Sequence, residues 1–136
     1  MGKILLDTHI LLWLTMNPEK LPKRTITLIE QKQRENNVLI SSISLWEIAM
    51  LASKNKISVY EPVRSLSQDI VDTDGLKVVD ISVDIASESI FLKDFHKDPA
   101  DRIIVATTRV TSSTLITKDQ EIIEWAQHGH IKYMEG

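Results

Sequence analysis

The most constraining feature of this sequence is a regular alternation of short apolar runs with longer segments of helical periodicity. Each run is four or five residues long, and the segments between them repeat their apolar residues at helical spacing. The runs predicted as strands are residues 3–6, 38–41, 77–80 and 113–117, with a weaker fifth strand at 131–133. Strands that are separated in this way by helices pair in parallel, and the helices then cover both faces of the sheet. We therefore predict a three-layer α/β/α fold around a parallel sheet of four to five strands.

The segments between the strands predict the helices of the two outer layers. They are expected at residues 9–15, 22–35, 43–54, 63–72, 83–91, 99–109 and 121–127. A chain of 136 residues, 43% of them apolar and 26% charged, is large enough to bury a real core. We expect one domain that covers residues 1–136.

Composition excludes several classes of protein. The chain has no cysteine, so neither a disulfide framework nor a thiolate metal site is available. Its longest apolar runs are far shorter than a membrane span, and the N-terminal MGKILLD is no signal peptide. We therefore expect a cytoplasmic protein with no membrane partner. With a net charge of −3, any binding to nucleic acid must rely on a local positive site or on bound cations.

Four acidic residues are predicted to lie at the same edge of the sheet. Asp7 ends the first strand and Asp119 follows the fourth, whereas Glu47 and Asp101 fall in the first turns of two helices. Ligands of parallel α/β sheets bind beyond the carboxyl ends of the strands. Because like charges raise one another's pKa, such a cluster favours a bound cation, and oxygen ligands suit Mg²⁺ or Mn²⁺.

Helix capping is the alternative explanation for each acid taken alone. Ser44 and Glu47 have the spacing of a capping box, and Asp98 is a candidate N-cap that places Asp101 three residues into its helix. The acid behind the fourth strand would cap the last helix in the same way. Capping gives no reason for all these acids to meet at one edge, nor for Asp7 after an apolar strand.

Polar residues beside these acids are candidates for supporting roles. Arg102 and Lys118 could hold phosphate groups, and His96 could touch the substrate. Thr8 and Thr117 could orient a carboxylate or a water molecule.

Two tryptophans and two histidines are predicted to have structural roles rather than roles in binding. Trp13 and Trp46 lie in apolar stretches and are predicted to belong to the core. The helix at 43–54 is apolar nearly all round, so it is either deeply buried or partly a surface for a partner. His128 and His130 flank a glycine near the C-terminus and are predicted to be surface residues.

Four motifs in this order resemble the PIN domain, a metal-dependent nuclease fold, and within it the VapC-type toxins of type II toxin–antitoxin pairs. They are LLDTHILLWL from Leu5, SSISLWEIAM from Ser41, HKDPADRIIVATT from His96 and LITKD from Leu115. The resemblance runs from residue 3 to residue 119. LLDTH alone is a weak signal, whereas the ordered set is specific.

The resemblance implies that Asp7, Glu47, Asp101 and Asp119 bind the metal, and it gives Asp98 no ligand role. The chain departs from this branch at positions 107 and 108, where two threonines stand in place of the frequent Gln-Ala pair. The sparse sequence after Asp119 is a second departure, and it makes the last strand uncertain. Neither departure touches an acid, so the metal site is expected to be retained.

The function implied is that of a Mg²⁺- or Mn²⁺-dependent endoribonuclease with RNA as substrate, a cognate antitoxin that covers the site, and a homodimeric assembly. One alternative is a catalytically weak PIN-like module that binds RNA or protein, and another is a solitary RNA-processing nuclease. A phosphatase or phosphotransferase is disfavoured, because His9 stands where an aspartyl nucleophile would have its second acid. A glycine-rich phosphate loop is also missing from the sequence.

Overall fold

A five-stranded parallel sheet forms the centre of the protein. The computed structural model describes residues 1–59 and 61–136, and the strands lie in the order β3-β2-β1-β4-β5. Their bounds are β1 (Ile4–Leu6), β2 (Val38–Ser41), β3 (Leu76–Val79), β4 (Thr114–Thr117) and β5 (Lys132–Glu135). Leu5 lies opposite Leu39 on one side and Leu115 on the other, and every pair of neighbouring strands is parallel. The predicted parallel sheet is confirmed, including its weak fifth strand.

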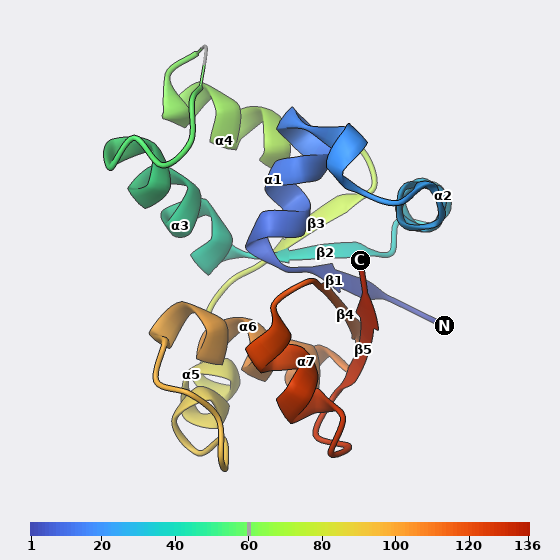
Figure 1. Ribbon diagram of the computed structural model, residues 1–136, viewed down its shortest axis with the longest axis vertical. Helices are drawn as coiled ribbons and strands as arrows, with labels where there is room; N and C mark the ends of the chain where they lie inside the picture. Colours follow the sequence, from blue (N-terminus) through green and yellow to red (C-terminus); the bar gives the residue numbers. More distant parts are fainter. Residues whose placement is uncertain (60) are drawn as a thin grey trace.

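Helices cover both faces of this sheet. Those on one face are α1 (Thr8–Met16), α2 (Lys23–Arg34), α3 (Ser42–Ser53) and α4 (Val63–Val71), with the 3-10 turn η1 (Pro18–Lys20) between the first two. Those on the other face are α5 (Val83–Ile90), α6 (Pro99–Thr111) and α7 (Gln120–Ala126). Figure 1 shows these two groups of helices above and below the strands. The three-layer α/β/α fold predicted from the sequence is therefore confirmed.

Alternation along the short strands divides the core into two parts. Ile4 and Leu6 pack under α1–α4, whereas Leu5 between them packs under α5–α7, and all three are 0% exposed. Burying one such aliphatic side chain stabilises the fold by about 1.5–3 kcal/mol. Because both faces of each strand are apolar, the strands read as unbroken apolar runs in the sequence.

The start of α3 differs from its prediction. Its N-cap is Ser41, whose hydroxyl accepts a hydrogen bond from the backbone N–H of Ile43 at 3.2 Å. Ser44 is instead buried within the helix, and Glu47 is the sixth residue of α3, in the second turn rather than the first. The capping box considered as the alternative role of Glu47 is therefore not formed, because Ser41 takes the cap.

Of the two tryptophans predicted to belong to the core, only Trp13 packs against it. Trp46 has 57% of its surface exposed, and Trp13 is only half-buried at the edge of the core. On α3, only Ser44 and Ile48 are buried, so this helix is not the deeply buried element that its composition allowed. An apolar helix at the outside of the molecule leaves apolar area in solvent, which is typical of an interaction surface.

Among the described residues, no helix is both long enough and apolar enough to cross a membrane.

Candidate functional site

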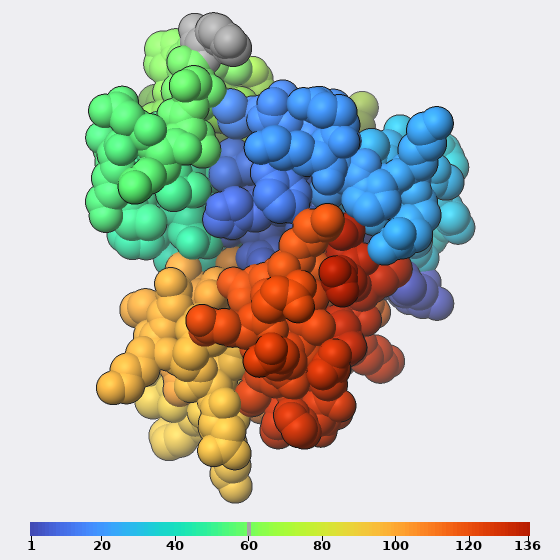
Figure 2. Space-filling model, in the orientation of Figure 1, coloured from blue at the N-terminus to red at the C-terminus, as the bar shows by residue number. Residues whose placement is uncertain are grey.

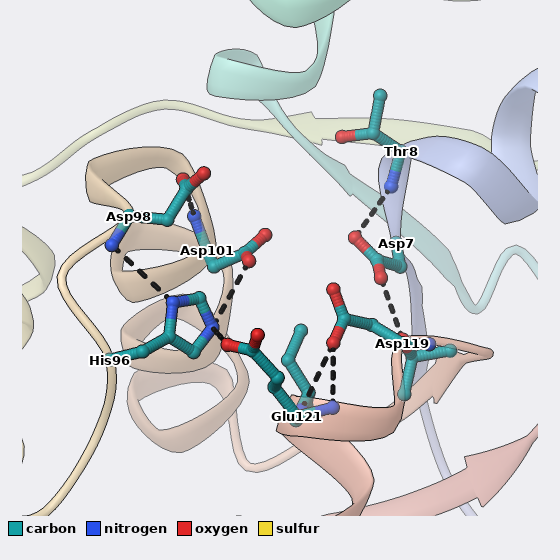
Figure 3. Close-up of polar contacts among 9 residues, drawn as sticks. Asp7, Thr8, His96, Asp98, Asp101, Asp119 and Glu121 are labelled. Carbon is teal, nitrogen blue, oxygen red and sulfur yellow. Dashed lines mark hydrogen bonds and ion pairs between the residues drawn. The ribbon is translucent and has the colours of Figure 1, made fainter.

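Asp7 lies at the carboxyl end of the central strand β1 and caps α1. Its Oδ1 accepts a hydrogen bond from the Thr8 N–H at 2.8 Å, and its Oδ2 accepts one from the Thr117 hydroxyl at 2.6 Å (Figure 3). The side chain is buried, with the residue 6% exposed. Burial raises the pKa of Asp7, the hydrogen bonds from Thr117 and Thr8 oppose that rise, and the charge of Asp119 adds to it.

Asp119 stands beside Asp7 at the end of the neighbouring strand. Its Oδ1 caps α7 by accepting hydrogen bonds from the N–H groups of Glu121 and Ile122, at 2.9 and 3.2 Å. The Asp119 N–H donates to the hydroxyl of Thr117 at 3.0 Å. Thr117, which is 0% exposed, thus links the two acids by donating to one and accepting from the backbone of the other. The predicted cap at Asp119 is confirmed.

Glu47 approaches the same edge from α3. Its Oε1 accepts a hydrogen bond from the Thr8 hydroxyl, and that hydroxyl also lies 2.8 Å from the hydroxyl of Ser44. Burial raises the pKa of Glu47, Thr8 opposes this, and the charges of Asp7 and Asp98 raise it further. Thr8 and Ser44 therefore position this carboxylate toward the end of β1.

Asp101 enters the site from the first turn of α6. Asp98 is the N-cap of that helix, and its Oδ1 accepts the N–H of Asp101 at 3.1 Å, as predicted. The Asp101 side chain is 16% exposed. Desolvation by burial is the largest cause that raises the pKa of Asp101 to about 8. The remaining causes are the negative charges of Asp7, Asp98, Asp119 and Glu47, in that order.

His96 contacts Asp101 from the loop before α6. Its Nδ1 accepts the N–H of Asp98 at 3.4 Å, which leaves the ring proton of the neutral tautomer on Nε2. Nε2 lies 3.2 Å from Asp101 Oδ2 and 3.6 Å from Glu121 Oε2 (Figure 3). The Nε2 atom is buried, and neither contact has the geometry of a hydrogen bond. His96 therefore stands between the acids at the strand ends and the surface of α7.

The two basic residues predicted to steer phosphate have different neighbours in the structure. The guanidinium of Arg102 donates to the backbone carbonyl of Leu92, at 3.4 and 3.5 Å. Lys118 Nζ lies 6.0 Å from the ring centroid of Trp13, a cation–π arrangement at the α1 side of the site. Arg102 thus anchors the loop before α6 instead of facing the carboxylates.

The arrangement fits a hard divalent cation. Carboxylates from β1, α3, α6 and the end of β4 are close enough for their charges to raise one another's pKa, and oxygen atoms are the donors that Mg²⁺ and Mn²⁺ prefer. Across residues 1–59 and 61–136, no group of three acidic or histidine side chains is already arranged as a metal cage. A cation bound here would neutralise the mutual repulsion of the carboxylates, which would have to turn toward it.

Sequence reasoning missed two residues of this site. Ser44 contacts Thr8, and the only signal was its position one helical turn before Glu47, which puts both on the same side of α3. Glu121 contacts His96, and no local pattern in the sequence relates these residues, which are 25 positions apart. The fold brings them together by placing the start of α7 against the loop before α6.

The fold and its cluster of carboxylates define a class of α/β proteins with an acidic site at the carboxyl ends of a parallel sheet. The PIN domain family matches residues 4–127, and the chain belongs to this family.

Individual proteins share this similarity over most of their length. Ribonuclease VapC22 of Mycobacterium tuberculosis is 31% identical over 123 residues, which cover 90% of this chain and 91% of that protein. VapBC2 from Rickettsia felis, bound to a DNA fragment from its promoter, contains a chain that superposes with a TM-score of 0.72 at 21% identity over 96% of each chain. DNA-bound VapBC from Salmonella typhimurium gives a TM-score of 0.69 at 21% identity over 98% of each chain. These two solved structures support the fold alone.

Proposed function

We propose that this protein is a Mg²⁺- or Mn²⁺-dependent endoribonuclease and the toxin of a toxin–antitoxin pair, which acts as a single domain in the cytoplasm. The observation that carries the proposal is the convergence of Asp7, Glu47, Asp101 and Asp119 at one edge of the sheet. A relative at 31% identity is named a ribonuclease, and similar solved chains come from toxin–antitoxin complexes, which supports the same reading.

In the proposed mechanism, the four carboxylates would bind the cation, and hydrogen bonds from Thr117 and Thr8 would position two of these carboxylates. When bound, Mg²⁺ or Mn²⁺ supplies a positive charge that stabilises the phosphoryl oxygens and lowers the pKa of the attacking water. Thr117 fixes one oxygen of Asp7, and Thr8 fixes one oxygen of Glu47, so each carboxylate keeps further lone pairs for the cation. Asp119 uses Oδ1 as a helix cap, which leaves Oδ2 for a ligand or for a water molecule.

The test compares asparagine variants of the two neighbouring aspartates of α6. Purified protein with Mg²⁺ or Mn²⁺ should cleave RNA, and EDTA should stop the reaction. Asp101→Asn should remove most of the rate, whereas Asp98→Asn should have a mild effect because asparagine also caps a helix. Equal rates for Asp101→Asn and wild type would contradict the site. Binding of RNA without cleavage by the wild type would favour the alternative of a PIN-like binding module.

A groove on the α1 side supports the proposal of an antitoxin partner. This groove, of about 940 Å³, runs between α1, the segment after α3, and α4. Its apolar lining includes Leu12, Trp13, Met16, Ile57 and Leu66. An apolar groove of this size suits the apolar face of an amphipathic helix from a partner protein. Met16→Glu, at a partly exposed residue of the groove, should abolish co-purification with an antitoxin expressed from the adjacent reading frame, while leaving ribonuclease activity in place.

Exposed apolar residues on α5 support a homodimer. Val83, Ile90 and Phe91 are 83%, 71% and 77% exposed, and they lie within one helix and the residue after it. This face is on the opposite side of the sheet from the antitoxin groove (Figure 1). A second copy of the chain and an antitoxin could therefore bind at the same time.

A further inference from the structure

A second cavity lies directly behind the catalytic carboxylates, on the α7 side of His96. It has a volume of about 530 Å³ and opens between the loop 94–96 and the segment that runs from α7 through the turn at 128–130. Cavities of a few hundred Å³ hold small organic groups. His96 lines this cavity and at the same time contacts Asp101 at 3.2 Å. Whatever occupies the cavity is therefore separated from the metal-binding acids by one imidazole ring.

The wall of the cavity is a set of ordered aromatic rings. Trp125 is 7% exposed, and its indole N–H donates to the Lys93 carbonyl at 2.8 Å, which fixes the ring. The His130 ring stacks on Trp125 with centroids 4.3 Å apart and planes 13° apart, so His130 is half-buried rather than the surface residue predicted. Phe95 packs against the same indole at 4.8 Å. The Arg109 guanidinium carbon also lies over this indole, 5.4 Å from the ring centroid. Trp125 is therefore covered and supports the His130 ring, which is left to stack on a ligand.

One more imidazole is free to stack on a ligand. His128 is exposed at the mouth of the cavity, with its ring centroid 6.4 Å from that of His130. Imidazole and other aromatic rings are the platforms on which proteins stack unpaired RNA bases.

The polar lining of the cavity selects against phosphate. Three carboxylates, those of Asp94, Glu121 and Glu124, surround the aromatic wall. Within the described part of the chain, the lining includes no lysine or arginine. A phosphate would be repelled here, whereas an exocyclic amino group of a base would find hydrogen-bond acceptors.

We propose that this cavity is a base subsite: it binds one unpaired nucleobase of the RNA, next to the scissile phosphate, and favours adenine, cytosine or guanine over uracil. The proposal rests on the proposed ribonuclease function. The preference follows from the carboxylates, because uracil alone of the four bases lacks an exocyclic amino group. The base subsite would select the cleavage position without taking part in the chemistry.

The first test measures sequence preference in cleavage. A set of RNA oligonucleotides that vary at the positions around one cleavage site is cut by wild type, Glu124→Gln and His128→Ala. One position should disfavour uracil in the wild type, and Glu124→Gln should weaken that preference. His128→Ala should raise KM about 5-fold or more with a smaller change in kcat, as expected from losing a base-stacking contact. Glu30→Gln, the same substitution at an exposed site on α2, is the matched control and should keep the wild-type preference.

The second test measures base binding without cleavage. Adenosine, cytidine and uridine, which carry no phosphate, are titrated into the Asp7→Asn protein in EDTA while the histidine ring signals are followed by NMR. Adenosine and cytidine should shift the His128 and His130 signals at lower concentrations than uridine. A parallel titration with Zn²⁺, in buffer without EDTA, asks whether the histidines and carboxylates form a metal site instead.

The outcomes separate the base subsite from the ribonuclease function. Active enzyme whose preference survives both substitutions, with no shift from any nucleoside, would overturn the subsite and leave the nuclease intact. An inactive wild type whose His128 and His130 signals still respond to adenosine would support the subsite and overturn the ribonuclease function. Signals that respond to stoichiometric Zn²⁺ but to no nucleoside would show a metal site and overturn the proposal.

Discussion

At the scale of single residues, the carboxyl of Asp101 connects the chemistry of the site to the stability of the fold. Its pKa is raised from 3.8 to about 8, first by burial and then by the surrounding acids. A carboxyl with a raised pKa binds its proton more tightly in the folded state than in the unfolded one. The metal-free protein should therefore lose stability as the pH rises from about 4 to about 8, and level off above.

Asp101→Asn should remove much of this pH dependence, because asparagine resembles the protonated acid and carries no charge. At pH 8 in EDTA, we expect the variant to be more stable than wild type by on the order of 2–5 kcal/mol, since one pKa unit corresponds to about 1.4 kcal/mol. Urea unfolding at pH 5 and pH 8 measures the difference. Adding Mg²⁺ at pH 8 should stabilise wild type more than the variant. Equal losses of stability between the two pH values would contradict the raised pKa.

Thr117 is a positioning residue whose hydroxyl serves two acids at once. Thr117→Val removes the donor to Asp7 and the acceptor for the Asp119 N–H, and it should cost about 1–3 kcal/mol of stability. We also expect the Mg²⁺ concentration for half-maximal cleavage to rise about 10-fold or more, and Thr117→Ser to restore it. Thr108→Val is the control: Thr108 is equally buried, but its hydroxyl donates to the Ile104 carbonyl within α6. A loss of stability in both variants without a changed Mg²⁺ requirement in either would leave Thr117 a purely structural role.

At the scale of elements, the turn into β3 depends on a glycine in the left-handed region. Gly75 has φ +85°, and a Cβ placed on it would collide with the backbone of Gln33 at the end of α2. Gly129 has the same φ of +85°, but a Cβ there would meet nothing within 4 Å. We expect Gly129→Ala to cost about 1 kcal/mol from backbone strain and Gly75→Ala to cost clearly more, because the Gln33 backbone cannot move aside without displacing α2. Thermal unfolding of the two variants checks this, and equal Tm losses would contradict the close contact.

Helices and strands also differ in how well the sequence predicts them. The strands were predicted to within two residues, because short apolar runs bounded by turn residues such as Asp7 or Asn36-Asn37 favour strands over helices. The acids could be placed at one edge because parallel strands all end there. The N-cap of α3 could not be predicted, because serines at positions 41, 42 and 44 are all candidates in the sequence. In the structure Ser44 contacts Thr8, and Ser41 is the cap.

Side-chain direction was harder to predict than backbone position. Arg102 follows Asp101 directly, yet successive residues of a helix point about 100° apart, so Arg102 binds the Leu92 carbonyl instead of the site. The cavity of the proposed base subsite could not be predicted from the sequence for a related reason. Its residues come from a loop, a helix and a turn that become neighbours only when α7 packs against the loop before α6.

At the scale of the whole molecule, the carboxylates at the edge of the sheet lie between the groove on the α1 side and the cavity on the α7 side. Figure 2 shows the surface of the α1–α4 half above that of the α5–α7 half. The carboxylates lie where these halves meet, because α3 of one half begins at the end of β2 and contacts α6 of the other half. Substrate that reaches this edge from the α7 side would pass the base subsite, whereas an antitoxin helix would arrive from the α1 side.

The α5 face gives the last prediction, which concerns assembly. A chain of 15.5 kDa that exposes Val83 and Ile90 at the two ends of α5, and Phe91 after it, should form a dimer of twice that mass in solution. The double variant Ile90→Ser and Phe91→Ser should shift the mass measured by light scattering toward the monomer, and circular dichroism should show that the chain is still folded, because both side chains are exposed in one copy. Val71→Ser, at a 38% exposed valine of α4 on the other side of the sheet, is the control and should remain dimeric. A wild-type monomer, or a double variant that stays dimeric, would exclude this face. Since the carboxylates come from a single chain, cleavage by the monomeric variant should continue at a rate similar to that of the dimer.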